Sequence, residues 1–334
     1  MGLNIRDIVP REEISFSDLK GKVIAVDAFN AIYQFLSSIR QYDGTPLMDK
    51  SGGISSHLSG LFYRNINLLS EGLKLIYVFD GKPPEKKFET NEARREAKDI
   101  AKEKFEEAKK KGDYGAMKKY SAQFIKIDEE MIEESKELLQ AMGIAVIQSP
   151  GEGEAQASIL AKERNSYGVA SQDYDCLLFG APRLIQNLTL ARKRKTVSGY
   201  IEINPEIIEL ERVLNYLQIN HDQLICLGIL IGTDYNPGGI RGIGQKKALQ
   251  IVQKYKTPIQ IFNQFDDLDF DWKEIFEMFK KPDVHKNVKI EFPKIHKEKI
   301  KEILISRDFS LDRVEKQIDK LTDIKTKNTQ KTLF

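Results

Sequence analysis

The segments VIAVD (23–27) and LIYVFD (75–80) decide the fold, because each is a short apolar run that ends in an aspartate. Between them, apolar residues recur at helical spacing over 31–42 and 57–72. Strand–helix–strand units of this length form parallel sheets with right-handed crossovers. We therefore predict an α/β fold whose central, mainly parallel, twisted sheet is flanked by helices.

Two later apolar runs also lead into acids. IAVIQSPGEGE (144–154) and GVASQDYD (168–175) each end in two carboxylates. With the aspartate of GTDYN, the acids are Asp27, Asp80, Glu152, Glu154, Asp173, Asp175 and Asp234. The carboxyl ends of parallel strands share one edge, where ligands bind, so we expect these acids to crowd together there. Like charges about 4 Å apart repel by roughly 4 kcal/mol at a surface-like dielectric, and hard divalent cations are the natural counter-charge.

The segment GEGEAQA (151–157) also has a simpler interpretation as a helix start whose acids complement the helix dipole. A glycine-rich turn before a helix normally invites phosphate, but two carboxylates repel phosphate unless a metal intervenes. Asp173 and Asp175, two apart on an extended chain, point the same way. Their presence favours the metal interpretation.

Composition limits the classes of function. The chain has 334 residues and a formal net charge of +2, so any nucleic-acid binding must use local basic patches. Two cysteines and four histidines without metal-ligand spacing argue against a disulfide framework or a zinc site and favour an intracellular setting. The most apolar stretch, LICLGILIG (224–232), is too short to span a membrane and is typical of a buried helix. From the start MGLNIR we expect no secretory signal.

The middle of the chain is dense in charge. Between residues 82 and 119, Lys and Arg outnumber Asp and Glu by 13 to 9. We predict one helix over 92–112, ended by Gly112, and a second over about 115–142, ended by Gly143. A charged helix is often just a solvated surface. Because this segment joins two strands that end at the acidic edge, it could instead stand over that edge.

Two further basic segments follow. The basic run Arg192–Lys195 is also consistent with an ordinary solvated hairpin. Helices are expected from about residue 205. IRGIGQKKA (240–248) has the form of a helix-hairpin-helix, whose tight turn and following lysines can grip a phosphate backbone without reading sequence. A plain helix–helix turn is the alternative.

Five motifs in this order resemble one family: VFDGKPP (78–84), GEGEAQA, SQDYDCLLFG (171–180), GTDY and IRGIGQKKA. The chain is similar to flap endonucleases of archaeal type, within the structure-specific 5′ nuclease superfamily. The resemblance implies a metal-dependent hydrolase that removes 5′ flaps from DNA, with 5′–3′ exonuclease activity, in replication and base excision repair. It implies two Mg²⁺ ions, replaceable by Mn²⁺, one held chiefly by Asp27, Asp80, Glu152 and Glu154 and the other by Asp173, Asp175 and Asp234.

The resemblance also carries roles to individual residues. Lys87 and Arg94 match a basic pair that neutralises the scissile phosphate, and with Asp175 they form the expected catalytic set. Tyr33 matches an aromatic residue on which a base near the cut stacks. The expected DNA contacts are Gly2, Tyr33, Arg40, Arg64, Glu152, Gly232, Asp234, Gly242, Gly244, Lys246 and Lys247. A potassium ion is expected against the carbonyls of the hairpin.

The family pattern divides the chain into five regions. They are an N-terminal nuclease region (1–98), an arch segment (99–115), an internal nuclease region with the helix-hairpin-helix (116–258), a C-terminal helical region (259–322) and a flexible tail (323–334). The charged middle becomes a helical arch that a free 5′ end threads beneath. The expected partners are branched DNA with a 5′ flap and, through Gln330, Leu333 and Phe334, a sliding clamp (PCNA). The family's aromatic pair is missing at its proper offset in this tail. We expect a monomer.

Three other functions compete. A nick-directed exonuclease or junction resolvase of the same superfamily is the nearest, and the compact insertion between Asp80 and Glu152 favours flap cutting over it. A non-catalytic binder of DNA structures would be expected to lose metal acids, and none is lost. A small RNA-cleaving domain would share the acidic edge but not the hairpin or the arch.

Overall fold

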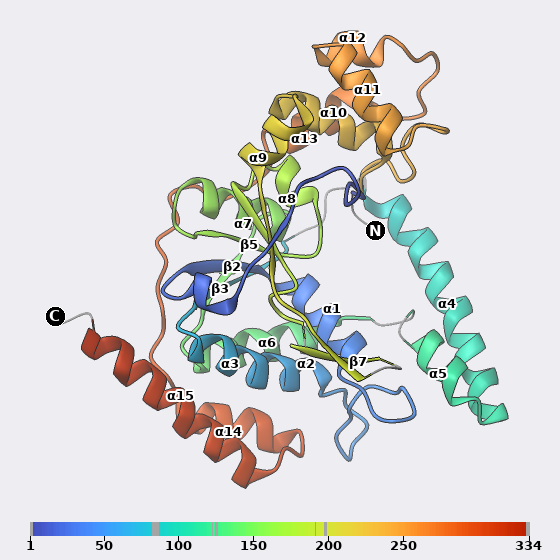
Figure 1. Ribbon diagram of the computed structural model, residues 1–334. Helices are drawn as coiled ribbons and strands as arrows, with labels where there is room; N and C mark the ends of the chain where they lie inside the picture. Colours follow the sequence, from blue (N-terminus) through green and yellow to red (C-terminus); the bar gives the residue numbers. More distant parts are fainter. Residues whose placement is uncertain are drawn as a thin grey trace.

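The computed structural model describes residues 3–81, 87–121, 123, 126–190, 192–196 and 199–331. Within this part, the side chains of 87–97, 118, 193–196 and 325–331 are not described. Figure 1 shows a central twisted sheet with helices on both faces, a helical lobe at one end and a pair of helices along one side.

Seven strands form the central sheet. They are β1 (Glu12–Glu13), β2 (Val23–Asp27), β3 (Lys74–Phe79), β4 (Ala145–Gln148), β5 (Gly168–Ala170), β6 (Arg183–Gln186) and β9 (Glu206–Glu209). Their order is β1-β9-β6-β5-β2-β3-β4. The five strands from β6 to β4 are parallel. Strand β9 pairs antiparallel with both β6 and β1, so within this sheet β9 alone runs against the other strands. The predicted mainly parallel sheet is confirmed.

Alternate residues of the central strands face two separate cores. On β2 and β3, Ala25 and Ile76 belong to one core, and Ile24, Val26 and Tyr77 belong to the other. Because both faces of the sheet are covered, each strand reads in the sequence as a continuous apolar run. The two acids that end these runs are therefore the first polar side chains beyond the cores.

The helices divide between the two cores. One core includes residues of α7 (Gly153–Lys162), α8 (Asp175–Leu178), α9 (Leu210–Leu217), α10 (His221–Ile231), α11 (Gln245–Lys254), α12 (Pro258–Phe262) and α13 (Trp272–Lys280). The other includes residues of the 3₁₀ helix η1 (Phe16–Leu19), α1 (Ala28–Ser38), α2 (Ser56–Ser59), the π-helix η2 (Gly60–Arg64), α3 (Asn65–Ser70), α6 (Glu129–Ala141), α14 (Lys297–Ser306) and α15 (Leu311–Lys331). Gly60 allows η2 to lie against α1, since a Cβ there would meet the Phe35 ring at 2.1 Å.

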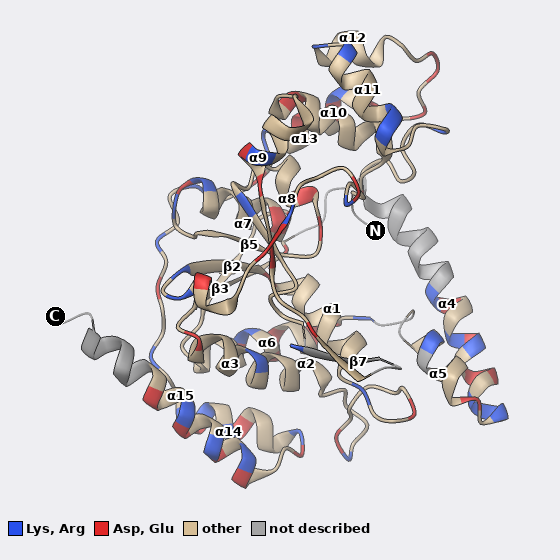
Figure 2. Ribbon diagram, viewed as in Figure 1, with Lys and Arg blue, Asp and Glu red and all other residues tan. Residues whose placement is uncertain are grey.

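Helices α4 (Lys87–Lys111) and α5 (Tyr114–Ser121) pair with each other beside the main body (Figure 1). Phe105, Ala108 and Met117 form a small apolar contact between them. Helix α4 starts five residues before the predicted start, and Gly112 ends it with a positive φ, as predicted. Figure 2 shows Lys and Arg along the described part of this pair.

Some predicted boundaries were wrong. The helix expected over about 115–142 is two helices, because the Asp128 side chain accepts the Met131 amide at 2.9 Å and starts α6 afresh. Residues 206–209 are a strand, not a helix, since Ile208 and Ile207 bury on opposite faces of the sheet. Helix α15 continues through Lys331, into the region expected as a tail from 323; the flexibility of that tail stays a prediction.

Two other features match their predictions. The basic run begins a two-stranded hairpin of β7 (Lys193–Thr196) and β8 (Gly199–Glu202), which is the ordinary hairpin interpretation. The apolar stretch 224–232 lies in the buried helix α10 and the glycine after it. Within the described residues, no helix combines the length and apolar character that crossing a membrane requires.

Candidate metal centre and nucleic-acid surfaces

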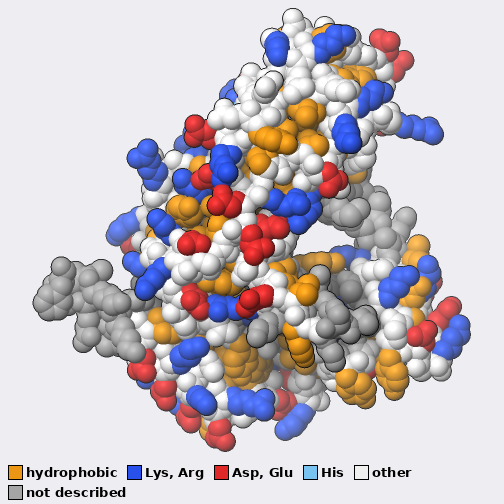
Figure 3. Space-filling view, in the orientation of Figure 1, with side chains coloured by type: hydrophobic (Ala, Val, Ile, Leu, Met, Phe, Trp, Pro, Cys, Tyr) orange, Lys and Arg blue, Asp and Glu red, His pale blue; other side chains and the backbone are white. Residues whose placement is uncertain are grey.

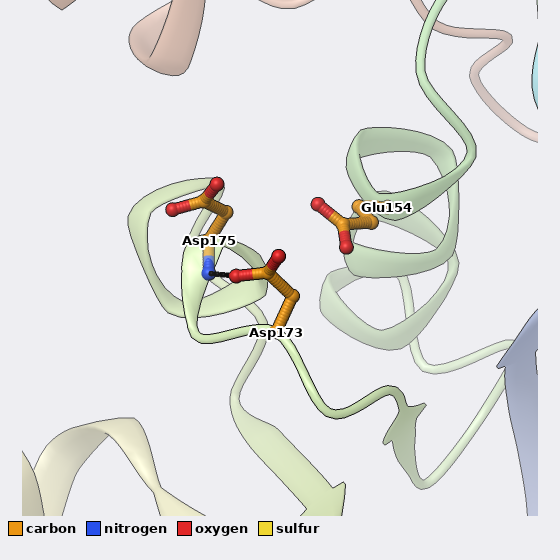
Figure 4. A group of neighbouring side chains, drawn as sticks. All are labelled: Glu154, Asp173 and Asp175. Atoms are coloured by element: carbon orange, nitrogen blue, oxygen red, sulfur yellow. Dashed lines mark hydrogen bonds between the residues drawn. The ribbon is translucent and has the colours of Figure 1, made fainter. Parts of the chain in front are cut away.

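Three acids from two segments meet at the carboxyl edge of the sheet. Glu154 lies in the first turn of α7, Asp173 in the loop after β5, and Asp175 at the start of α8. One carboxylate oxygen of each lies within 4.8 Å of the others. Figure 4 shows the three side chains turned toward one another. The Asp175 amide donates to Asp173 Oδ1 at 3.3 Å, which holds the two aspartates in one tight turn.

Burial and mutual repulsion raise the pKa of all three acids. Burial is the larger cause of the raised Glu154 pKa, and the charges of Asp173 and Asp27 add to it. Burial also raises the pKa of Asp173 to about 6. For Asp175, burial and the Asp173 charge raise the pKa well above its usual range. Such a group is stable only with protons or a cation to neutralise it.

Asp27 joins this cluster through Ser171. Asp27 ends β2, is 4% exposed, and accepts the Asn30 amide at 3.0 Å as the cap of α1. The Ser171 hydroxyl lies 3.1 Å from Asp27 Oδ2 and 3.5 Å from Glu154 Oε1. Its oxygen also accepts the Asp173 amide at 3.1 Å. Ser171 therefore ties three acids together, a role that sequence reasoning missed although the residue opens the SQDYD motif.

Asp80 and Glu152 lie where β3 meets the start of α7. The Gly153 amide donates to Asp80 Oδ1 at 2.7 Å. A Cβ at position 153 would sit 2.5 Å from that oxygen, which explains the second glycine of GEGE. The Tyr235 hydroxyl donates to Glu152 Oε2. Tyr235 was also missed, although the sequence places it directly after Asp234.

Asp234 lies in the loop that follows α10. Its charge contributes to the raised pKa of Asp173 and of Asp175. Buried Asn236 shapes this loop: its Oδ1 accepts the Thr233 amide at 3.1 Å and the Thr233 hydroxyl at 2.8 Å. The structure thus brings all seven predicted acids to one edge of the sheet.

The donor set at this edge suits hard divalent cations. All the converging atoms are carboxylate oxygens, the ligands that Mg²⁺ and Mn²⁺ prefer. The neighbouring thiol of Cys176 is buried, and its pKa is raised well above its usual range by burial and then by Glu154, so it stays protonated. A soft-metal site is therefore disfavoured.

The turn between α10 and α11 is built from glycines. A Cβ at Gly232 would meet the Gly239 amide at 2.6 Å, so this glycine has a packing reason for its place. Gly242 has a positive φ, and added Cβ atoms at Gly242 and Gly244 would both meet open space. Lys246 and Lys247 are exposed in the first turn of α11, which contains no acid. Two exposed glycines and two exposed cations therefore lie together in this turn and at the start of α11.

Basic side chains extend over this end of the molecule. Arg241, which sequence reasoning passed over although it lies inside IRGIG, is also exposed. Figure 3 shows Lys and Arg side chains spread over the lobe that contains α11 and α12. Helix α10 packs on α8, so the lobe is connected directly to the helix that begins with Asp175.

Three other predicted DNA contacts lie in or just after α1 and in η2. The Tyr33 side chain on α1 is 43% exposed. Arg40 donates to the Gly44 carbonyl at 2.7 Å and to the Ser121 hydroxyl at 2.6 Å, which ties the end of α5 to the main body. Arg64 lines a hollow of ≈ 220 Å³, and burial lowers its pKa.

Several predicted residues lie beyond what the structure describes. Gly2, Leu333 and Phe334 lie outside the described residues, and the side chains of Lys87, Arg94 and Gln330 are not described. Their expected roles stay predictions.

Comparison with known protein families gives two matches. Residues 5–101 match the XPG N-terminal domain, and residues 143–234 match the XPG I-region. The seven acids all fall within these two ranges.

Individual proteins are similar over nearly the full chain. Flap endonuclease 1 of Hyperthermus butylicus is 48% identical over 329 residues, covering 96% of this chain and 94% of that protein. Flap endonuclease 1 of Pyrococcus furiosus is 50% identical over 336 residues, covering 100% and 98%. The structure of flap endonuclease-1 from Methanococcus jannaschii matches with a TM-score of 0.77 and 40% identity, covering 98% of this chain and 100% of that one.

Proposed function

Because this chain belongs to the flap endonuclease 1 family, we propose that it hydrolyses DNA phosphodiester bonds at the base of 5′ flaps, with the acidic edge as its divalent-metal centre. The observation that carries the proposal is the convergence of Glu154, Asp173 and Asp175 within 4.8 Å. The same site would serve 5′–3′ exonuclease activity, in replication and base excision repair.

The seven acids would hold two Mg²⁺ ions, with Mn²⁺ as a substitute. Asp27, Asp80, Glu152 and Glu154 belong chiefly to one ion, and Asp173, Asp175 and Asp234 to the other. When bound, two such ions supply the attacking hydroxide and stabilise both the attacking and the leaving oxygen. The hard oxygen donors support a divalent-cation centre. The repulsion among the acids, which adds to the rise in their pKa values after burial, would be relieved by a bound cation.

Neighbouring residues hold these ligands in place. The Ser171 hydroxyl fixes Asp27 relative to Glu154, and the Tyr235 hydroxyl orients Glu152. Asp80 fixes the start of α7 by accepting the Gly153 amide. Ligands that are already held in place need little reorganisation when metal and substrate bind. Such preorganisation is a main source of the rate enhancement in active sites.

Positive charge near the acids would come from Lys87 and Arg94. Both lie on α4, which follows β3 and therefore begins close to Asp80 in the chain. They would neutralise the scissile phosphate as charge builds on it. The exposed ring of Tyr33 would stack on a base next to the cut.

Duplex DNA would be gripped by the α10–α11 turn. The amides near Gly242 and Gly244 and the side chains of Lys246 and Lys247 suit a phosphate backbone. A potassium ion against the carbonyls of this turn would add to the grip. Gly2, Arg40, Arg64 and Gly232 are the other proposed DNA contacts.

The α4–α5 pair would act as the helical arch. The pair lies along one side of the molecule and joins the strands β3 and β4, which both lead to the acidic edge (Figure 1). Threading of a free 5′ end beneath it would make cleavage depend on structure rather than on sequence. We further propose that the protein acts as a monomer and binds a sliding clamp through Gln330, Leu333 and Phe334.

The test is cleavage of 5′-labelled flap, nicked, blunt and four-way junction DNAs with Mg²⁺ or with EDTA. We expect the flap to be cut fastest and EDTA to abolish cutting. Preferred cutting of the junction or of the nick would instead identify a resolvase or an exonuclease. Flap binding without cutting would identify a non-catalytic binder.

A further inference from the structure

A second hollow lies at the opposite edge of the sheet from the acids. It has a volume of ≈ 770 Å³ and is lined by residues at the starts of β2 and β6, before β5 and at the end of α7. Helix α7 begins at the acidic edge and ends here, and ten helical residues span about 15 Å. This hollow is therefore separate from the metal centre.

The lining is strongly basic. Lys22, Lys162, Arg164 and Arg183 line the hollow, and no Asp or Glu is found among the described residues that form its wall. Arg183 is paired with Glu209 at 3.1 Å. In the described part of the chain, no Asp or Glu forms an ion pair with any of the other three, and all three are exposed.

Tyr167 draws two of these cations together. Lys22 Nζ lies 4.9 Å from the centre of the Tyr167 ring, and the Arg183 guanidinium lies 4.5 Å from it. The ring holds both cations by cation–π attraction. It does not neutralise Lys22, whereas Arg183 also has Glu209 as its partner. Two cations are thus held beside Tyr167, and Lys162 and Arg164 line the hollow at and just after the end of α7.

Ser166 supplies a second, independent sign of a ligand. The residue is 6% exposed and lines the hollow. Its hydroxyl is buried and, within the described residues, has no hydrogen-bond partner. Buried hydroxyls normally have one, and an anionic oxygen at this wall would accept its hydrogen bond.

From these observations we propose that the hollow binds a small anion with two or more phosphate groups, such as a polyphosphate or a nucleoside triphosphate. Its volume is within the range of small-molecule sites. Several cations around one hollow, of which Lys22, Lys162 and Arg164 have no acidic partner among the described residues, suit a chain of phosphates better than a single phosphate. The competing role for Lys162 and Arg164 is to complement the carbonyl end of α7.

The test uses isothermal titration calorimetry of metal-free protein in EDTA, at fixed ionic strength. The probes are tripolyphosphate, ATP and a single-stranded oligonucleotide. We expect tripolyphosphate to bind and Lys162→Gln/Arg164→Gln to weaken it by about tenfold or more, since two charge-assisted contacts are lost. The matched control Lys286→Gln/Lys316→Gln removes the same charge from exposed positions elsewhere and should bind within about twofold of wild type.

A second variant separates binding from stability. Ser166→Ala should weaken tripolyphosphate without lowering Tm, because it removes a hydroxyl that has no partner. Equal affinities for ATP and tripolyphosphate would show that the site recognises the phosphates alone. A higher affinity for ATP would show that the site also recognises the nucleoside. The proposal is overturned if tripolyphosphate does not bind, if Lys162→Gln/Arg164→Gln lowers Tm but not affinity, or if only the oligonucleotide responds to the substitutions. Flap cleavage by these variants without added anion should equal that of wild type.

Discussion

Two groups of three acids are neutralised in different ways in this molecule. Asp49, Glu130 and Glu134 converge on one guanidinium: Arg307 Nη1 lies 3.0 Å from Asp49 Oδ2, and Nη2 lies 2.7 Å from Glu134 Oε1 and also contacts Glu130. Glu154, Asp173 and Asp175 converge on one another. No ion pair with a Lys or Arg is found for this second group among the described residues.

The pKa of Asp49 in the first group and the pKa values of the acids in the second group move in opposite directions. Hydrogen bonds from Ser51 and then Arg307 hold the pKa of Asp49 well below its usual range. Burial and neighbouring acids raise the pKa of Glu154 and Asp175. The difference shows how to tell a structural acid cluster from a ligand site: the first contains its own cation, and the second requires one from solution.

Removing one acid from the metal centre should have the largest effect. Asp175→Asn should lower single-turnover flap cleavage by about a thousandfold or more, because a lost ligand removes much of the charge stabilisation. Flap binding should stay within about threefold of wild type, since phosphate contacts elsewhere supply the affinity. The control Asp269→Asn changes an exposed acid and should leave cleavage intact. Equal turnover by Asp175→Asn and wild type in Mg²⁺ would contradict the metal assignment.

Removing the cation of the structural group should instead affect stability. Arg307→Met leaves three acids together without their partner and should lower the free energy of unfolding by about 2 kcal/mol. Denaturant unfolding measures this loss. Cleavage per folded molecule should change little. A variant as stable as wild type would show that the Arg307 ion pairs contribute nothing.

A smaller effect is expected from pH, which should change the stability of the folded protein through Asp173 in a defined direction. The raised Asp173 pKa, about 6, means that the folded protein holds this proton more tightly than the unfolded chain does. The proton on Asp173 therefore stabilises the folded protein fully at a pH below the pKa that Asp173 has in the unfolded chain. This stabilisation is lost as the pH rises through about 6. In EDTA, Asp173→Asn should be more stable than wild type at pH 8 and similar to it at pH 4. A stability difference that does not vary with pH would contradict the raised pKa.

The smallest effect is expected at a positioning residue. Tyr235→Phe removes the hydroxyl that donates to Glu152 and should lower cleavage by about tenfold at limiting Mg²⁺. Saturating Mg²⁺ should recover most of that loss, because the ligand itself is still present. A loss that is the same at every Mg²⁺ concentration would mean that Tyr235 acts on DNA or on folding instead.

The acidic edge was predictable because it depends on chain order. Asp27 and Asp80 end apolar strands, so parallel pairing alone brings them to one edge. Ser171 and Tyr235 lay inside quoted motifs but escaped notice, since hydroxyls with no charge leave no pattern. The Arg307 group could not be predicted, because Asp49 and Arg307 are 258 positions apart. The break before α6 was missed because Asp128 caps a new helix only once α5 has ended.

We expect the acidic edge, and not the Arg307 group, to bind divalent cations. Calorimetric titration of DNA-free protein with Mn²⁺ at pH 7 distinguishes the two groups of acids. Wild type and Arg307→Met should bind Mn²⁺ with similar affinity, and Asp175→Asn should bind it at least about tenfold more weakly. Unchanged Mn²⁺ affinity in Asp175→Asn, or loss of Mn²⁺ binding in folded Arg307→Met, would rule out this difference between the two groups.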